Sequence, residues 1–413
     1  MEYKHSIGEK IIFDLKTHLT NIGCLFTWDS QNKCVQTQID GEILMEDGII
    51  LGIGSSTENG DVLIDCEQKL VTPGFVDSHT HPVFFHGREE EYSQRLSGMS
   101  YQEIAEKGGG IQSSINGVRN ASIDELVEQV RLRMDRFLQN GTTTIEAKSG
   151  YGLSTESELK SLEVINRVSE NHHIDIIPTF MGAHAFPPEY SGNHDSYVDL
   201  ICDEMIPAVA EQGITKYCDV FCEKGYFDLD QTSKILSTGK EVGLIPRIHA
   251  DEFQDSGAAE LAAELDCVSA DHLMAVSENG IRALAEKNVT GTLLPGTTFF
   301  LGSHQYAPAR RMLDEGVFIA LATDFNPGSS HIQSMPFMLV LACLYLHMSI
   351  EEALIASTWQ GAVSLGVEDK VGSIEIGKQA DIIIWDMEKP IDVVYSCPGA
   401  KIKHVFKKGY QIF

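Results

Sequence analysis

The sequence predicts an α/β protein whose main body is a (β/α)8 barrel, with a small discontinuous β-sandwich domain made from both ends of the chain. Three observations favour this fold class. The 413 residues exceed one ordinary domain, short apolar runs alternate with amphipathic helical segments through the middle, and both ends are rich in β-type runs. Alternating strands and helices are typical of parallel βαβ units, and eight of them match a closed barrel. We place the barrel at residues 71–367 and the small domain at 1–70 and 368–413.

Both ends of the chain are expected to form short strands separated by turns. The expected strands cover residues 10–15, 24–27, 41–45, 49–53 and 62–64 at the N-terminal end, and 372–377, 380–385 and 402–406 at the C-terminal end. Because chain termini often lie close together, β-rich ends around a different middle indicate one composite domain. Two unrelated terminal extensions are the alternative.

The middle of the chain supplies the barrel. Strands are expected at residues 74–76, 142–145, 174–179, 217–221, 244–248, 267–270, 290–294 and 317–322. Helices are expected at 123–138, 156–168, 198–211, 230–241, 278–286 and 309–315, with two more at 336–347 and 350–365. Residues 82–121, which include Gly108-Gly-Gly110, exceed a simple βα step, so we expect a long loop with short helices at the barrel mouth.

Composition and charge exclude several classes of protein. Hydrophobic residues make up 43% and charged residues 22% of the chain, as in ordinary soluble globular proteins. A net charge of −29 opposes binding to nucleic acid and to anionic membranes. We find no signal peptide and no run near the ~20 apolar residues of a membrane span. The nine cysteines lack metal or redox spacing, which favours a reducing, cytoplasmic location.

Polar residues follow nearly every expected barrel strand, where barrel enzymes place their catalytic groups. In chain order they are His79, His81, Glu146, Lys148, His184, Glu223, His249, Asp271, His272 and Asp324. His79 and His81 leave the same face of a strand and could grip one metal ion. A lone histidine there more often caps or packs, but the same residue types at several strand ends favour a metal site.

The ligand set that we predict is His79, His81, His249 and Asp324. Three neutral imidazoles and one carboxylate leave positive charge on a divalent ion, which lowers the pKa of a bound water toward neutrality. Glu252 and His272 would then serve proton transfer. This combination indicates hydrolytic chemistry.

Several stretches resemble the amidohydrolase superfamily and, within it, the imidazolonepropionase family. The superfamily-wide stretches are Pro73-Gly-Phe-Val-Asp-Ser-His-Thr-His81 and Thr323-Asp-Phe-Asn-Pro-Gly-Ser329. Narrower ones are Lys148-Ser-Gly-Tyr-Gly152 and Phe221-Cys-Glu-Lys-Gly225. The resemblance covers nearly the whole chain, although the first seventy residues match only loosely.

The resemblance implies ring opening of 4-imidazolone-5-propanoate by water, giving N-formimino-L-glutamate in histidine degradation. It implies one Zn or Fe ion, attack by metal-bound hydroxide on the ring carbonyl, His272 stabilising the oxyanion, and Glu252 with Asp324 moving protons. The implied substrate contacts are Arg88, Tyr151, His184, Glu252, Asn326, Gly328 and Ser329, with a small anionic imidazolone as ligand and a homodimer as the assembly.

Arg88 is the residue that selects this substrate, because a guanidinium binds a carboxylate bidentately. The alternative for Arg88 is a surface ion pair with Glu89, Glu90 or Glu91. The family's Gly-Gly turn is replaced here by Phe85-His86-Gly87, which could change the approach of Arg88.

Three other functions compete with this one. A mononuclear deaminase of a cyclic amidine or nucleobase shares the ligands, but Arg88 and Tyr151 argue against a neutral substrate. A binuclear hydrolase would need a bridging lysine where this chain has Phe221-Cys-Glu223. A non-catalytic scaffold of the same fold would lack ligands that are all present here.

Overall fold

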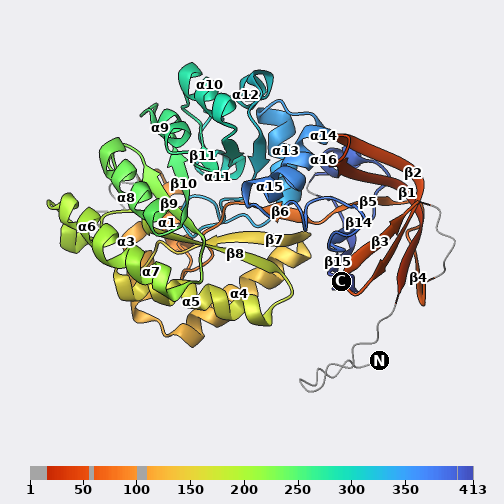
Figure 1. The fold of residues 1–413 in the computed structure, drawn as a ribbon, viewed down its shortest axis with the longest axis horizontal. Helices are drawn as coiled ribbons and strands as arrows, with labels where there is room; N and C mark the ends of the chain where they lie inside the picture. The colour runs from red at the N-terminus through yellow and green to blue at the C-terminus, as the bar shows by residue number, and fades with distance from the viewer. Residues whose placement is uncertain (1–15, 55–59, 100–108, 398, 413) are drawn as a thin grey trace.

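A sheet of eight parallel strands in sequential order forms the centre of the computed structural model, which describes residues 16–54, 60–99, 109–397 and 399–412 (Figure 1). The strands are β6 (Phe75–Asp77), β7 (Thr142–Lys148), β8 (Asp175–Ala183), β9 (Tyr217–Cys222), β10 (Ile245–Ala250), β11 (Ser269–His272), β12 (Thr290–Leu293) and β13 (Ile319–Leu321). Each overlaps one of the eight strands expected from the sequence, so the barrel prediction is confirmed.

The first and last barrel strands meet through the residues that follow them. Asp324 N–H donates to the carbonyl of His79 (3.1 Å), and His81 N–H donates to the carbonyl of Phe325 (2.8 Å). Below them, Thr323 N–H donates to Asp77 Oδ1 (3.0 Å). The barrel is therefore nearly closed, and its closure lies at the same level as three of the predicted metal ligands.

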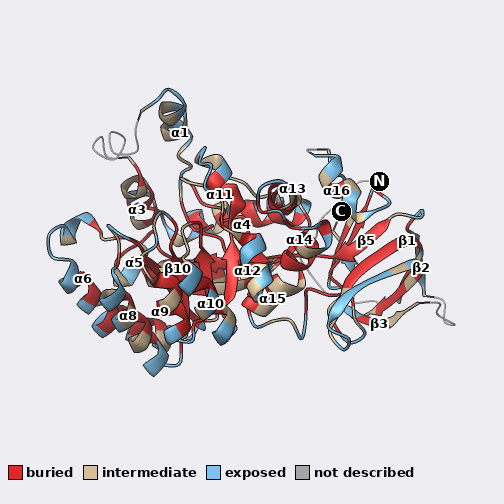
Figure 2. Cartoon of the chain, turned by 90° about the horizontal axis from the view of Figure 1, so that it is seen from above, coloured by how far each residue is buried: buried red, intermediate tan, exposed pale blue. Residues whose placement is uncertain are grey.

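Helices surround the barrel, and most of them bury one face toward it (Figure 2). They are α4 (Ile123–Gln139), α5 (Thr155–Asn171), α6 (His194–Leu200), η2 (Ile201–Met205), α7 (Ile206–Gln212), α8 (Leu229–Glu241), α9 (Ala258–Glu264), α10 (Glu278–Lys287), α11 (Pro295–Phe300), α12 (Ala309–Glu315), α13 (Met335–Tyr345), α14 (Ile350–Ala356) and α15 (Trp359–Ser364), with a 3-10 turn η1 (Pro188–Tyr190). Of these, α6 and α13 pack against other helices. Within the described ranges, no helix combines the length and apolar content that a membrane crossing requires.

Two of the expected helices are not continuous. The segment expected at 198–211 contains the π-helical turn η2, and the segment expected at 350–365 is broken between α14 and α15. At that break, the hydroxyls of Ser357 and Thr358 both donate to the carbonyl of Leu354 (3.1 and 2.6 Å). Such back-bonding competes with the helix and ends it.

The long segment after β6 carries α1 (Glu89–Leu96) and α3 (Ile111–Asn120), as expected for residues 82–121. Residues 100–108, which include the expected Gly108, lie outside the described residues. The segment extends beyond the barrel on one side (Figure 2). It therefore places Arg88 and Ile111 beside the cavity described below.

A second sheet joins the two ends of the chain. Its strands are β1 (Thr17–Asp29), β2 (Cys34–Glu46), β3 (Ile49–Ile53), β4 (Val62–Asp65), β5 (Leu70–Pro73), β14 (Ile382–Trp385), β15 (Ile402–Lys407) and β16 (Tyr410–Gln411). The antiparallel pairing of β5 with β14 links the ends, and the sheet buries a core of its own around Leu19, Ile43 and Ile384. The domain limits at 70/71 and 367/368 stay predictions.

The strand expected at 372–377 is wrong, because these residues form a turn. Gly372 and Gly377 both have φ +88, a left-handed conformation that interrupts a strand. Ile374 nevertheless enters the core of the small sheet, and its N–H donates to Thr27 Oγ1 (2.7 Å). The strand expected at 10–15 lies outside the described residues, and helix α16 (Pro390–Tyr395) was not predicted.

Candidate active site and metal centre

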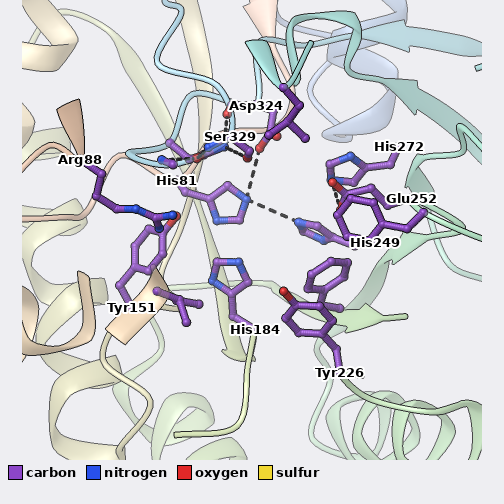
Figure 3. Close-up of a pocket in the computed structure, with 16 residues that line it drawn as sticks. His81, Arg88, Tyr151, His184, Tyr226, His249, Glu252, His272, Asp324 and Ser329 are labelled. Carbon is purple, nitrogen blue, oxygen red and sulfur yellow. Dashed lines mark hydrogen bonds and ion pairs between the residues drawn. The ribbon is translucent and has the colours of Figure 1, made fainter. Parts of the chain in front are cut away.

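A cavity of about 400 Å³ lies at the carboxyl ends of the barrel strands (Figure 3). Its polar lining contains most of the residues predicted from the sequence: His81, Arg88, Tyr151, His184, His249, Glu252, His272, Asp324, Asn326, Gly328 and Ser329. His79 is fully buried against His81. The structure thus brings every predicted site residue to one place. The apolar lining of Phe221, Tyr226 and Phe253 was not predicted as part of the site.

The four predicted ligands converge on one point. Nε2 of His81 lies 3.2 Å from Nε2 of His79 and 3.4 Å from Nε2 of His249. Oδ1 of Asp324 lies 3.6 Å from Nε2 of both His79 and His81. All four side chains are buried. Burial, with neighbouring cationic groups, holds the pKa of His79 and of His81 well below the usual value, which keeps both imidazoles in the neutral form that binds metal.

Two carboxylates fix the outer nitrogens of these histidines. His79 Nδ1 lies 2.7 Å from Asp271 Oδ2, and His249 Nδ1 lies 3.0 Å from Asp219 Oδ1. Because an ionised carboxylate only accepts, each Nδ1 carries the proton and each Nε2 presents a lone pair. Lone pairs and a carboxylate oxygen that face each other at these distances repel unless a cation lies between them. The donor set therefore fits a metal ion.

Asp324 is held in a strained but supported conformation. Its φ is +52, and its Oδ2 accepts a hydrogen bond from Thr297 Oγ1 (2.5 Å), which leaves Oδ1 for the centre. Burial raises the pKa of Asp324 to about 6, because desolvation penalises its charge. A bound cation would oppose that penalty.

Glu252 and His272 form a second titratable pair beside His249, across the cavity from Arg88 and Tyr151 (Figure 3). Oε2 of Glu252 lies 3.7 Å from Nε2 of His272. Burial, then the nearby Asp324 and Glu223, raise the pKa of Glu252 well above its usual value. A protonated Glu252 can donate. Glu223 also accepts the N–H of Phe253 (2.8 Å), which fixes the residue after Glu252.

Arg88 lines the cavity and also forms an ion pair with Glu91. Its Nε donates to Glu91 Oε2 (3.0 Å), yet this pair is not on the surface, since the Arg88 side chain is only 8% exposed. Arg88 also lines the cavity, so the Phe85-His86-Gly87 sequence does not divert it. Its guanidinium lies against Gly328, where an added Cβ would come within 2.5 Å of Nη2. Only glycine leaves that space.

His184 lies between Tyr151 and the ligand cluster. Its ring stacks on that of His81 (centroids 4.9 Å apart), and its Nδ1 donates to the Gly150 carbonyl (2.8 Å). Burial is the main cause that lowers the pKa of His184 to about 3, so the ring is neutral. A proton on Nδ1 leaves Nε2 as an acceptor for a ring N–H.

Asn326, Gly328 and Ser329 form one tight turn after β13. Asn326 Oδ1 accepts the N–H groups of Gly328 (2.8 Å) and Ser329 (2.7 Å), and its Nδ2 donates to Ser329 Oγ (2.8 Å). The Asn326 side chain therefore builds the turn that lies beside Arg88. Strand-end position predicted the ligands, whereas the anchoring roles of Asp219, Asp271 and Thr297 were missed because they depend on which strands are neighbours.

Comparison with known proteins agrees with this geometry. A model of the amidohydrolase family matches residues 248–412. Fold and site together thus define a metal-dependent amidohydrolase. The imidazolonepropionase of Clostridium tetani (strain Massachusetts / E88) is 46% identical over 381 residues, which cover 91% of each chain. The chain belongs to the imidazolonepropionase family, and it is a hydrolase of carbon–nitrogen bonds in cyclic amides.

Solved structures share the fold at low sequence identity. The 5-methylcytosine deaminase from Klebsiella pneumoniae, liganded with 5-fluorocytosine, has a TM-score of 0.75 at 16% identity, covering 96% of this chain and 97% of that one. An adenosine deaminase from Xanthomonas campestris with bound zinc has a TM-score of 0.68 at 16% identity, covering 96% and 92%. These similarities support the barrel with its second sheet.

Proposed function

We propose that this protein opens the ring of 4-imidazolone-5-propanoate with water to give N-formimino-L-glutamate, a step of histidine degradation. One observation carries the proposal: His79, His81, His249 and Asp324 lie in mutual contact at a cavity that Arg88, with a side chain only 8% exposed, also lines. The four side chains fit a metal ion, and Arg88 fits a carboxylate tail. The imidazolonepropionase relatives support the same substrate.

His79, His81, His249 and Asp324 would hold one Zn or Fe ion, since their nitrogen and oxygen donors lie close together and suit both metals. The zinc in the structurally similar adenosine deaminase makes zinc a reasonable first choice. When bound, such an ion lowers the pKa of a coordinated water and so supplies a nucleophile at neutral pH.

The residues of the chain then bind, orient and move protons. Arg88 binds the propionate, while Tyr151 and the acceptor Nε2 of His184 orient the ring. Asp324 accepts the proton of the attacking water, and His272 stabilises the oxyanion that forms at the ring carbonyl. Glu252, kept protonated by burial, gives its proton to the departing nitrogen as the carbonyl carbon–nitrogen bond breaks. Asp324 then carries one proton more and Glu252 one proton less, and passage of a proton from Asp324 to Glu252 restores the site. The sum is hydrolysis, with one water consumed.

A deaminase of a neutral base is the second candidate, since the structural neighbours include deaminases. Arg88 disfavours it, because a cationic side chain in the cavity wall suits a substrate that carries a carboxylate better than it suits a neutral base. We also keep the homodimer and the cytoplasmic location as predictions.

The test is a substrate comparison on the purified, metal-analysed protein. We expect one Zn or Fe per chain and turnover of imidazolonepropionate, followed by absorbance, with no turnover of neutral purine or pyrimidine bases. The Asp324→Asn variant should keep its circular dichroism spectrum and lose at least ~1,000-fold in kcat. Wild-type activity in that variant, or faster turnover of a neutral base, would refute the proposal.

A further inference from the structure

We infer that Lys148 is a positioning residue that holds both halves of the ligand set, His79 with His81 on one side and His249 on the other. The inference rests on the proposed metal centre and extends it to a residue beneath that centre. Lys148 ends strand β7 inside the barrel and is fully buried. Its Nζ donates to Glu146 Oε1 (2.6 Å) and to Asp219 Oδ2 (2.7 Å).

The first branch runs from Lys148 to the backbone between the two histidines. Glu146 Oε2, on the same carboxylate that Lys148 holds, accepts the N–H of Thr80 (3.1 Å). Thr80 Oγ1 donates back to the Glu146 carbonyl (2.5 Å), and the N–H of Lys148 donates to the Thr80 carbonyl (3.0 Å). Every polar backbone group of Thr80 is thus bonded to β7. Because Thr80 lies between His79 and His81, these bonds set the direction of both imidazoles.

The second branch runs from Lys148 to His249. Asp219 accepts from Lys148 at Oδ2 and bonds His249 Nδ1 at Oδ1 (3.0 Å). One carboxylate therefore joins the ammonium to the imidazole and fixes the tautomer in which Nε2 faces the centre. His79 is held in a similar way but with a longer ion pair. Its Nδ1 bonds Asp271 Oδ2, and Arg247 lies 3.5 Å from that oxygen.

Charge gives Lys148 a role that a neutral side chain could not fill. Glu146 and Asp219 are fully buried carboxylates, and Lys148 contacts both within 2.7 Å. Burial opposes the charge of Lys148, but the two carboxylates outweigh it and raise its pKa. Removing the ammonium would leave two buried anions side by side, and each would turn toward another donor. We expect both ligand branches to lose their direction.

The test measures metal affinity rather than turnover. Zinc dissociation constants are obtained for the full chain by competition with a chromogenic chelator, and ligand geometry is followed through the visible spectrum of the cobalt-substituted protein. We expect Lys148→Met to bind zinc about 10- to 100-fold more weakly, the range found when groups behind metal ligands are removed. The cobalt spectrum should change with it.

Lys407→Met is the matched control. Lys407 is also buried, at 1% exposure, and its Nζ contacts two carboxylates, Asp175 (2.8 Å) and Asp381 (2.6 Å), but neither contacts a predicted ligand. This variant should lose stability while zinc affinity and the cobalt spectrum remain those of the wild type. Equal zinc affinity in both lysine variants would overturn the role of Lys148.

A double variant protects the test against misfolding. In Glu146→Gln/Lys148→Met, one of the two uncompensated charges is gone, and the amide oxygen can still accept from Thr80. We expect it to fold and still to bind zinc more weakly than Glu146→Gln alone; equal affinity would overturn the inference. If the wild type binds no zinc, cobalt or iron, the proposed function itself fails.

Discussion

Arg88 depends on a single glycine for its position in the cavity. The three end atoms of its guanidinium lie 2.5–2.7 Å from where a Cβ on Gly328 would be, so any larger residue must displace it. Sequence comparison alone could place Arg88 near the substrate, but not show that Gly328 makes room for it. The two residues are distant in the chain but lie against each other in the cavity wall.

We predict that Arg88→Met raises KM for imidazolonepropionate roughly 100-fold, because hydrogen bonds to charged groups contribute about 1.5–3 kcal/mol each. Gly328→Ala should raise KM in the same direction while Arg88 is still present. Steady-state kinetics measure both. Arg136→Met, outside this cavity, should leave KM unchanged. An unaltered KM in Arg88→Met would reduce Arg88 to the partner of Glu91.

At the scale of elements, helix α5 fixes the loop that carries Tyr151. Glu158 Oε2 accepts the N–H of Gly150 (2.9 Å), and Oε1 accepts those of Gly152 (2.8 Å) and Leu153 (2.8 Å). The loop needs this support, since Leu153 has φ +51 and Gly150 has φ +108. The Gly150 carbonyl in turn fixes His184.

Glu158→Gln should therefore weaken both folding and substrate binding. An amide has one acceptor oxygen, so a loop N–H loses its partner, at a cost of about 1–3 kcal/mol in unfolding free energy. We expect KM to rise because Tyr151 and His184 shift together. Denaturant unfolding and kinetics measure the two effects. The control is Glu163→Gln on the same helix, where Glu163 pairs with the exposed Arg167. It should change neither the unfolding free energy nor KM. A normal KM in Glu158→Gln would contradict the link between Glu158 and the substrate-binding residues.

Local sequence patterns predicted most elements and failed where distant contacts decide. Helix α12 matches its expected bounds, and α4 begins at Ile123 as expected, after a capping box at Ser122. The break before α15 was not predicted, although the hydroxyls of Ser357 and Thr358 end α14 locally. The placement of α15 after the break depends on distant packing, since a Cβ on Gly361 would lie 2.6 Å from the Val76 carbonyl. That approach depends on the whole barrel.

For the whole molecule, a cluster of charges joins the barrel to the small sheet. Asp175, at the start of β8, accepts from Lys407 (2.8 Å), Lys408 (2.7 Å) and Gln379 (2.8 Å), all from the C-terminal part. Burial alone would raise the pKa of Asp175, but the two lysines and Gln379 have the larger combined effect. The pKa of Asp175 therefore lies below its usual value. The carboxylate therefore stabilises the folded chain in its ionised form.

This shift predicts a pH dependence with a definite sign. The stabilisation by Asp175 should be present above its unfolded pKa, near 4, and lost as pH falls through the lower folded value. Asp175→Asn should cost about 1–3 kcal/mol of unfolding free energy at pH 7, and progressively less below pH ~4. Urea unfolding of metal-free protein measures this. Asp124→Asn, at a 93% exposed carboxylate, is the control; a cost independent of pH would contradict the prediction.

The architecture was predictable because barrel strands alternate with helices in strict order. The convergence of the candidate ligands was predictable because the strand ends of a parallel barrel meet on one edge. The residues that hold these side chains in place from inside the barrel were not predictable. Asp219 and Asp271 hold histidines from other strands, so their roles follow only from the closed arrangement. The sequence thus predicts which residues meet at the candidate site, and the fold determines what holds their side chains in position.

His79, His81 and Asp324, which we propose as metal ligands, also close the barrel, so an ion bound there would link metal binding to the completion of folding. These ligands come from the first and last strands, so an ion held by all of them bridges the joint between the two ends of the barrel. Free ion then stabilises the folded chain by RT ln(1 + [ion]/Kd). A growing chain cannot assemble the full ligand set before its eighth strand is made, so tight occupancy marks a finished barrel.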